Sequence, residues 1–209
     1  MAVARPRQLS GERAQRIVDA MRSSVARRGA AASTFERVAR EAGVSRGLLH
    51  YYFQTKEKLL VEVVRRDTEL RLAALDAALA GARTADEVID ALVRSLEDLV
   101  EREPELVTVV FELFTAARRT EEIAVEVAEL YRRTREQMVA LLRAKQEEGV
   151  LALHEQPDAV ATILSALGDG VAMRMLLEPD RDFGPTLRAG IVCARALLTD
   201  GRPAGAVNG

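Results

Sequence analysis

Residues 33–60 read STFERVAREAGVSRGLLHYYFQTKEKLL and decide the fold of the N-terminal part of the chain. Ser33 and Glu36 match a capping box, in which each side chain bonds the other residue's backbone N–H, so a short helix should begin there. A turn follows at Gly43, because glycine adopts the left-handed conformation without strain. Ser45 can cap a second short helix that runs through the aromatic residues after it. This order of a short helix, a glycine turn and another short helix is that of a helix-turn-helix, whose second helix enters the major groove of DNA.

The second short helix has two faces of different chemistry. Val44, Leu49 and Phe53 recur at helical spacing and should anchor it inward. The outward face carries Arg46, Gly47, Leu48, His50 and Tyr51. Arginine can bond guanine through two N–H groups, histidine and tyrosine can reach a base edge or a phosphate, and glycine lets a helix approach another surface closely. The alternative interpretation is that the tyrosines cover a small core and the arginine is solvated.

The charge is divided unevenly along the chain. Residues 1–60 carry 12 Lys and Arg against 5 Asp and Glu, whereas the rest carries 18 against 27, within a net charge of −2. A basic module on an acidic body indicates a polyanion partner for the N-terminal module. Basic patches are common on small domains, so the charge alone does not identify DNA as that partner.

Residues 34–60 resemble the signature of the TetR family of transcriptional repressors nearly throughout. The landmarks are Thr34, Ala42-Gly43-Val44-Ser45, Tyr52-Phe53, Lys56 and Leu59-Leu60. The family most often has tyrosine at the position of His50, so an operator preference cannot be transferred from relatives. The strong resemblance covers residues 10–60, and the rest matches only as an all-helical body of suitable length.

The resemblance implies an all-α fold, with an N-terminal three-helix helix-turn-helix domain followed by a larger helical ligand-binding and dimerisation domain. It implies a sequence-specific regulator of double-stranded DNA: a ligand-released repressor that acts as a homodimer on a palindromic operator. The DNA-binding residues that it implies are Ser33, Thr34, Ser45, Arg46, Gly47, Leu48, His50, Tyr51, Tyr52 and Lys56. The residues at the two helix starts and Tyr52 would hold phosphates, whereas the recognition helix would face the bases.

The rest of the chain is predicted to be helical throughout. Thr84 and Glu87 match a second capping box, and Pro157 opens an apolar helix that should end at Leu177. The predicted domains are a helix-turn-helix domain at 1–54 with a flexible leader at 1–9, a ligand-binding and dimerisation domain at 55–200, and a disordered tail at 201–209.

The last two long helices are expected to form the dimer interface. Their apolar stripes would pair with those of a second subunit in a four-helix arrangement. The residues predicted for this interface are Leu164, Leu167, Val171, Leu187, Ile191, Ala194 and Leu198. The alternative is an ordinary intramolecular core.

The middle helices are expected to enclose a small, mainly apolar effector. The candidate pocket mixes aromatic, thioether and hydroxyl groups, as ligand pockets do. Its residues are Phe111, Phe114, Thr115, Tyr131, Thr134, Met138 and Met173. An apolar stripe with occasional methionine is also typical of a plain core.

Other classes of protein have less support in the sequence. The chain has 2 His and 1 Cys, and it lacks HExxH, GxSxG and Gly-rich phosphate-binding motifs, so we expect no enzyme, no metal site and no cofactor. A protein-binding helical bundle, an activator and an architectural DNA-binding protein remain alternatives. The N-terminus lacks an apolar signal core and no apolar run approaches ~18 residues, so we expect a cytoplasmic protein without a membrane partner.

Overall fold

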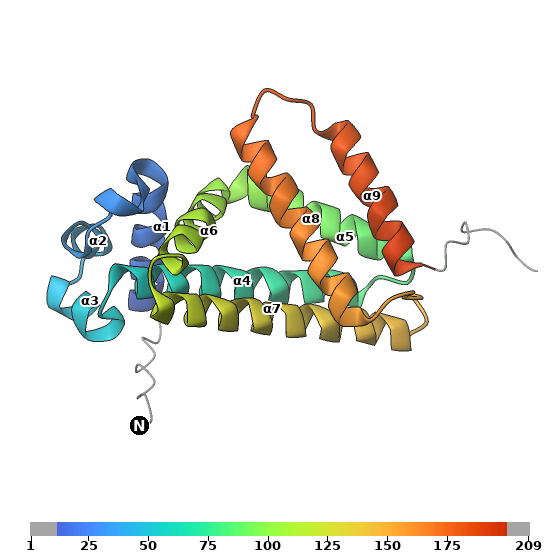
Figure 1. Cartoon of the computed structure of the whole chain (residues 1–209), viewed down its shortest axis with the longest axis horizontal. Helices are drawn as coiled ribbons and strands as arrows, with labels where there is room; N and C mark the ends of the chain where they lie inside the picture. Colours follow the sequence, from blue (N-terminus) through green and yellow to red (C-terminus); the bar gives the residue numbers. More distant parts are fainter. Residues whose placement is uncertain (1–11, 200–209) are drawn as a thin grey trace, which may run out of the picture. The chain divides into compact units, whose positions relative to one another are not determined.

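The computed structural model describes residues 12–199, which fold into helices joined by turns and loops, with no strand in that range (Figure 1). The all-α prediction is confirmed. In chain order the helices are α1 (Glu12–Ala32), α2 (Phe35–Ala42), α3 (Arg46–Phe53), α4 (Lys56–Ala80), α5 (Ala85–Arg102), α6 (Pro104–Ala117), α7 (Glu121–Glu147), α8 (Pro157–Leu177) and α9 (Gly184–Leu198). The predicted leader and tail lie outside the described residues.

The described residues form two compact units. One contains residues 12–68 and 104–131, so that α1, α2, α3 and the start of α4 share a unit with α6 and the start of α7. The other contains residues 69–103 and 132–199, with α5, α8 and α9 packed on one another. The domain boundary proposed at residues 54 and 55 stays a prediction.

Helix α1 is interrupted at Gly29. Gly29 has φ 73° and ψ 166°, a backbone conformation that side chains other than glycine rarely adopt. Upstream of the break, Ile17, Val18 and Met21 are fully buried on one face of the helix. The break leaves a short last turn through Ala32, which leads into α2.

Helix α2 begins one residue later than the sequence predicts. Thr34 is its N-cap, with the Thr34 hydroxyl accepting from the Arg37 backbone N–H at 3.4 Å. The predicted capping box between Ser33 and Glu36 is therefore wrong. Ser33 instead has no exposed surface, and its hydroxyl donates to the Gly29 carbonyl at 2.9 Å. By contrast, the capping box between Thr84 and Glu87 at the start of α5 is confirmed.

The core of the second unit changes the assignment of two predicted interface residues. Ala194 and Leu198 of α9 are 8% and 0% exposed, and they pack with buried residues such as Val88 and Val160. Leu164 and Ile191 pack against the same core. Leu198 has no surface to offer a partner and Ala194 has very little, so both residues belong to the intrachain core rather than to a dimer interface.

Candidate nucleic-acid interface

The recognition helix α3 is held by one buried side chain and by turns at both ends. Leu49 has no exposed surface, and the Ser45 hydroxyl accepts from the Leu48 N–H at 3.2 Å to cap the helix. Gly43 ends α2 in the left-handed region, with φ 66° and ψ 38°. After it, the Val44 N–H bonds the Ala39 carbonyl at 2.9 Å. These contacts fix which face of α3 points outward.

The outward face of α3 carries the side chains that the sequence predicts for base contact. Arg46, Gly47, His50 and Tyr51 are exposed, and Leu48 is half-buried. The Arg46 Nε donates to the His50 Nε2 at 3.3 Å, so the two side chains form one polar surface. A Cβ added at Gly47 would meet nothing within 4 Å. The fold of this chain therefore does not itself require a glycine at position 47.

The aromatic rings of α3 are not equivalent. Tyr51 is 66% exposed, whereas Tyr52 is half-buried and contacts the Tyr51 ring edge-on at 5.0 Å between centroids. The His50 ring packs edge-on against Phe35 of α2 at 4.7 Å. The interpretation in which both tyrosines cover the core does not hold for Tyr51, which projects into solvent.

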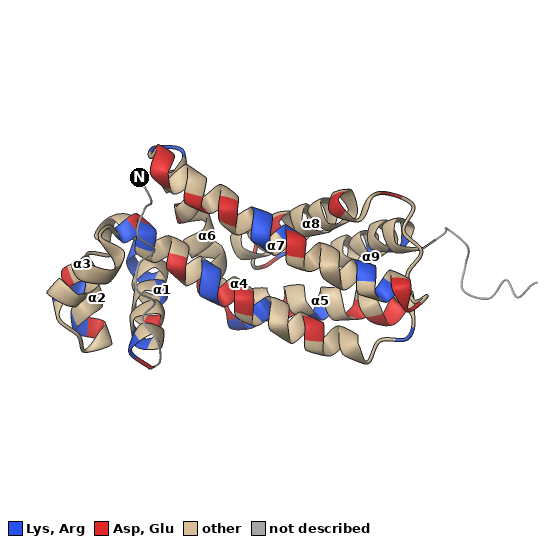
Figure 2. Ribbon diagram, turned by 90° about the horizontal axis from the view of Figure 1, so that it is seen from below, with Lys and Arg blue, Asp and Glu red and all other residues tan. Residues whose placement is uncertain are grey.

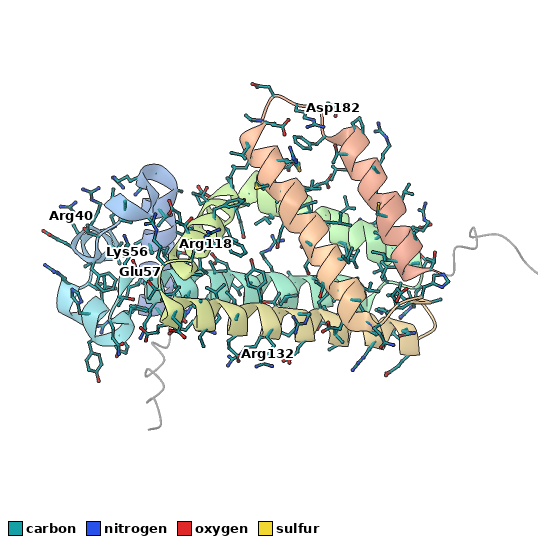
Figure 3. The ribbon with its side chains drawn as sticks, viewed as in Figure 1. Arg40, Lys56, Glu57, Arg118, Arg132 and Asp182 are labelled. Atoms are coloured by element: carbon teal, nitrogen blue, oxygen red, sulfur yellow. The ribbon has the colours of Figure 1, made fainter. Side chains whose placement is uncertain are left out.

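The three side chains predicted for phosphate contact near the helix starts have different surroundings. Thr34 is exposed, with its hydroxyl at the N-terminus of α2. Lys56, labelled in Figure 3, is half-buried and donates from Nζ to the Ala30 carbonyl at 2.7 Å. Ser33 has no exposed surface, and its hydroxyl also accepts from the Ser24 hydroxyl at 2.9 Å. The prediction that the Ser33 hydroxyl bonds phosphate is corrected on this ground.

Helix α2 adds an exposed cation that the sequence analysis missed. Arg40, labelled in Figure 3, lies in the last turn of α2 and is exposed. The neighbouring Arg27 and Arg28 are different, because both pair with Glu41, at 3.0 and 3.2 Å. Figure 2 shows basic and acidic residues together on α1, α2 and α3. The excess of basic residues before residue 60 was the available signal, but it did not show which of the exposed arginines pair with a carboxylate.

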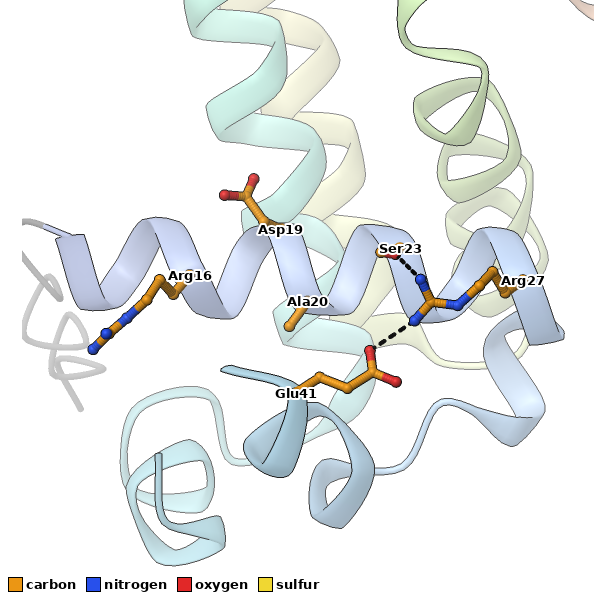
Figure 4. Close-up of a pocket in the computed structure, with 6 residues that line it drawn as sticks. All are labelled: Arg16, Asp19, Ala20, Ser23, Arg27 and Glu41. Carbon is orange, nitrogen blue, oxygen red and sulfur yellow. Dashed lines mark hydrogen bonds and ion pairs between the residues drawn. The ribbon is translucent and has the colours of Figure 1, made fainter. Parts of the chain in front are cut away.

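A hollow of about 490 Å³ lies beside α1 (Figure 4). The Arg27 guanidinium bonds both the Ser23 hydroxyl and Glu41 at its edge. The residues that line the hollow are Arg16, Asp19, Ala20, Ser23, Arg27 and Glu41. This charged lining does not suit the mainly apolar effector that the sequence predicts.

The predicted effector residues divide between the two units. In the first unit, Phe111 is 40% and Phe114 47% exposed, and the Phe114 ring lies 5.6 Å from that of Tyr131. The Thr115 hydroxyl bonds the Phe111 carbonyl of its own helix. In the second unit the members of the set are Thr134, Met138 and Met173, all half-buried. The pocket that would join these residues stays a prediction.

Helices α8 and α9 each leave an apolar stripe exposed. Leu167 is 38% and Val192 64% exposed, whereas Val171 and Leu187 are half-buried. The exposed stripe of α8 contains Ile163, Ala166, Leu167 and Leu177, and that of α9 contains Ala189, Val192, Cys193 and Ala196. On α9 this stripe lies about 180° around the helix from the predicted one, which follows from 100° per residue. A partner would therefore contact a different face of α9 from the predicted one.

Helix α8 is also long and apolar enough, by length and composition, to cross a membrane. Its most apolar 18-residue window has a mean hydropathy of 1.5, and 17% of that window is buried. Asp169 and Arg174 interrupt this helix, so its high mean hydropathy comes from alanines and large apolar residues on either side of them rather than from one unbroken apolar run. A helix that packs against protein on two faces passes the same test.

Two family models match the chain. Residues 17–63 match the model described as bacterial regulatory proteins, tetR family. Residues 85–197 match the model described as BetI-type transcriptional repressor, C-terminal. The chain belongs to the TetR family. It is a transcriptional regulator with a DNA-binding domain rather than an enzyme, and the second match supports a repressor role.

Relatives and solved structures extend the likeness over most of this TetR-family chain. The HTH-type transcriptional regulator BetI of Rhizobium meliloti (strain 1021) is 32% identical over 167 residues, which are 79% of each chain. The fatty acid degradation regulator FadR of Bacillus halodurans has a TM-score of 0.73 at 18% identity, covering 90% of this chain and 96% of its own. A putative transcriptional regulator of Saccharomonospora viridis in complex with choline has a TM-score of 0.65 at 24% identity, covering 88% and 97%. At these identities the two structures show the fold alone.

Proposed function

We propose that the protein is a homodimeric repressor that binds a palindromic operator in double-stranded DNA and that a small effector releases. The observation that carries the DNA-binding part is the outward face of α3, with exposed Arg46, His50 and Tyr51 around Gly47 on a helix anchored by Leu49. Exposed arginine, histidine and tyrosine side chains can reach base edges in the major groove, and phosphate contacts from Thr34, Tyr52 and Lys56 would set the register. A regulator of this kind acts on DNA in the cytoplasm.

We propose that dimerisation uses the exposed stripes of α8 and α9. The two helices pack on each other in the second unit, and each keeps large or small apolar side chains in solvent. Two such helices from each subunit would form a four-helix interface, in which Ala166 and Ala189 allow close approach. Among the predicted interface residues, Leu167 lies on this stripe, and the half-buried Val171 and Leu187 lie beside it. Dimerisation would also explain why α8 is apolar both on the face that packs inside the second unit and on its exposed stripe.

We propose a small, mainly apolar effector that contacts the aromatic residues of α6 and α7. Phe111, Phe114 and Tyr131 each keep 36% or more of their surface exposed, and a group of exposed aromatic rings can mark a ligand-binding groove. The complex of the Saccharomonospora viridis neighbour with choline supports a small organic ligand for this fold. Release requires that the ligand bind more tightly to a form with low DNA affinity.

The DNA proposal is tested by the salt dependence of binding to a duplex that the wild-type protein selects from a random pool. Lys56→Ala should lower the slope of log affinity against log salt by about 0.9, because one phosphate contact is lost. Gly47→Ala should weaken binding without changing the slope, since a methyl group adds bulk at the groove but no charge. Fluorescence anisotropy over a salt series measures both. Affinity that does not depend on salt would exclude this function.

The dimer proposal has a matched pair of variants. Val192 on the α9 stripe and Val125 on α7 are each 64% exposed, so replacing either by glutamate adds the same charge at the same exposure. Val192→Glu should yield monomers in sedimentation, because an unpaired carboxylate in a dry interface costs several kcal/mol. Val125→Glu should remain dimeric. Equal dimerisation of both variants would place the interface elsewhere.

The effector proposal predicts linked effects on stability and DNA binding. A small molecule that raises the unfolding temperature of the wild-type protein should weaken its operator affinity, and by linkage the operator should weaken binding of that molecule by the same factor. Phe114→Ala should lower affinity for the molecule several-fold and leave ligand-free DNA binding near that of the wild type. If the molecule releases Phe111→Ala and Phe114→Ala from DNA as readily as it releases the wild type, the pocket assignment is wrong, although the regulator assignment stands.

A further inference from the structure

The backbone N–H of Ala30 is bonded by a side chain from far along the sequence. The break at Gly29 turns the next peptide group out of the regular helical geometry, so its N–H needs another acceptor. Ala30 is only 8% exposed, and a buried N–H without an acceptor is unfavourable. A carboxylate oxygen of Glu112 in α6 accepts this N–H at 3.3 Å. Glu112 therefore stabilises the break in α1.

The carbonyl of the same residue holds Lys56. The Ala30 carbonyl accepts from the Lys56 ammonium at 2.7 Å and from the Ser33 backbone N–H at 3.1 Å. An ammonium has three N–H donors, so this bond leaves two for another acceptor. The position of the ammonium depends on the Ala30 carbonyl, whose orientation depends on the backbone conformation at the break. Glu112, Ala30 and Lys56 thus form one chain of contacts from α6 to the start of α4, all within the first unit.

We propose that Glu112 is a positioning residue for DNA binding. Its carboxylate fixes the Ala30 backbone, and the Ala30 carbonyl then holds the Lys56 ammonium where it meets a DNA phosphate. The proposal rests on the DNA-binding function proposed above. It assigns to a residue of α6, outside the helix-turn-helix, a direct effect on the affinity for DNA.

The sign of the effect separates this role from simple electrostatics. Removing a carboxylate from a protein that binds a polyanion should raise affinity, because one repulsive charge is lost. Glu112→Ala is instead expected to lower affinity, since Lys56 loses its fixed position. Glu105, in the first turn of the same helix, provides the matched control, because Glu105→Ala removes an equal charge.

The experiment measures operator affinity over a salt series for the full-length wild type, Glu112→Ala, Glu105→Ala, Lys56→Ala and the double variant Glu112→Ala/Lys56→Ala. Glu112→Ala should bind roughly tenfold more weakly at moderate salt, which is what the loss of a hydrogen bond to a charged group predicts. Its salt slope should fall toward that of Lys56→Ala. The double variant should bind like Lys56→Ala alone, because both substitutions remove the same contact. Glu112→Gln keeps an oxygen acceptor for the Ala30 N–H and should bind more tightly than Glu112→Ala.

Several outcomes would overturn the inference. If the Glu112→Ala variant binds the operator as tightly as the Glu105→Ala variant, Glu112 does not position Lys56. A weaker salt dependence of Lys56→Ala would still confirm the DNA proposal. Additive losses in the double variant would show that the two residues act separately. Amide hydrogen exchange of the folded wild type provides a measurement without any substitution. Slow exchange at Ala30 is expected, and exchange at the rate of an unbonded amide would exclude the contact. Absence of salt-dependent binding by the wild type would overturn both proposals.

Discussion

A recognition helix of eight residues is too short to be stable alone in water, so everything that α3 does depends on its attachment to the rest of its unit. Only a few contacts make this attachment. Leu49 supplies the buried anchor, Ser45 caps the start of the helix, and the left-handed Gly43 sets the angle at which the chain arrives from α2. Because one narrow face provides the packing, the opposite face is free to carry arginine, histidine and tyrosine. The DNA-binding proposal follows from this division of one short helix into two faces.

Much of the local structure could be predicted from residue types and spacing. The turn at Gly43 and the capping box between Thr84 and Glu87 depend on interactions within a few residues, so the sequence contains the needed information. The bounds of α8 agree with the prediction for the same reason, since Pro157 favours a first helical turn and the residues after Leu177 end the helix. The outward residues of α3 could be named because their neighbours at helical spacing are apolar.

Other features could not be predicted because they depend on contacts distant in sequence. Ser33 looks like a helix cap, but the break in α1 brings its hydroxyl to Ser24 and buries it. Helix α9 has two apolar faces, and periodicity alone does not say which of them packs inside the chain. Tertiary packing places Leu198 in the core and leaves Val192 in solvent. The contact between Glu112 and Ala30 spans 82 positions, and neither residue carries a motif that signals it.

The central claim is that two copies of α3 bind DNA through their outward faces, and the sequences that the protein selects test this most directly. Duplexes enriched from a random pool by the wild-type protein should contain two inverted copies of one half-site, with centres separated by one turn of DNA (about 10 base pairs) or a multiple of it. Repeating the selection with Arg46→Ala should relax the preference at one symmetry-related base pair in each half-site and preserve the others. Enrichment of a single unrepeated site would contradict the dimeric arrangement. An unchanged preference after loss of Arg46, or no enrichment at all, would contradict base recognition by α3.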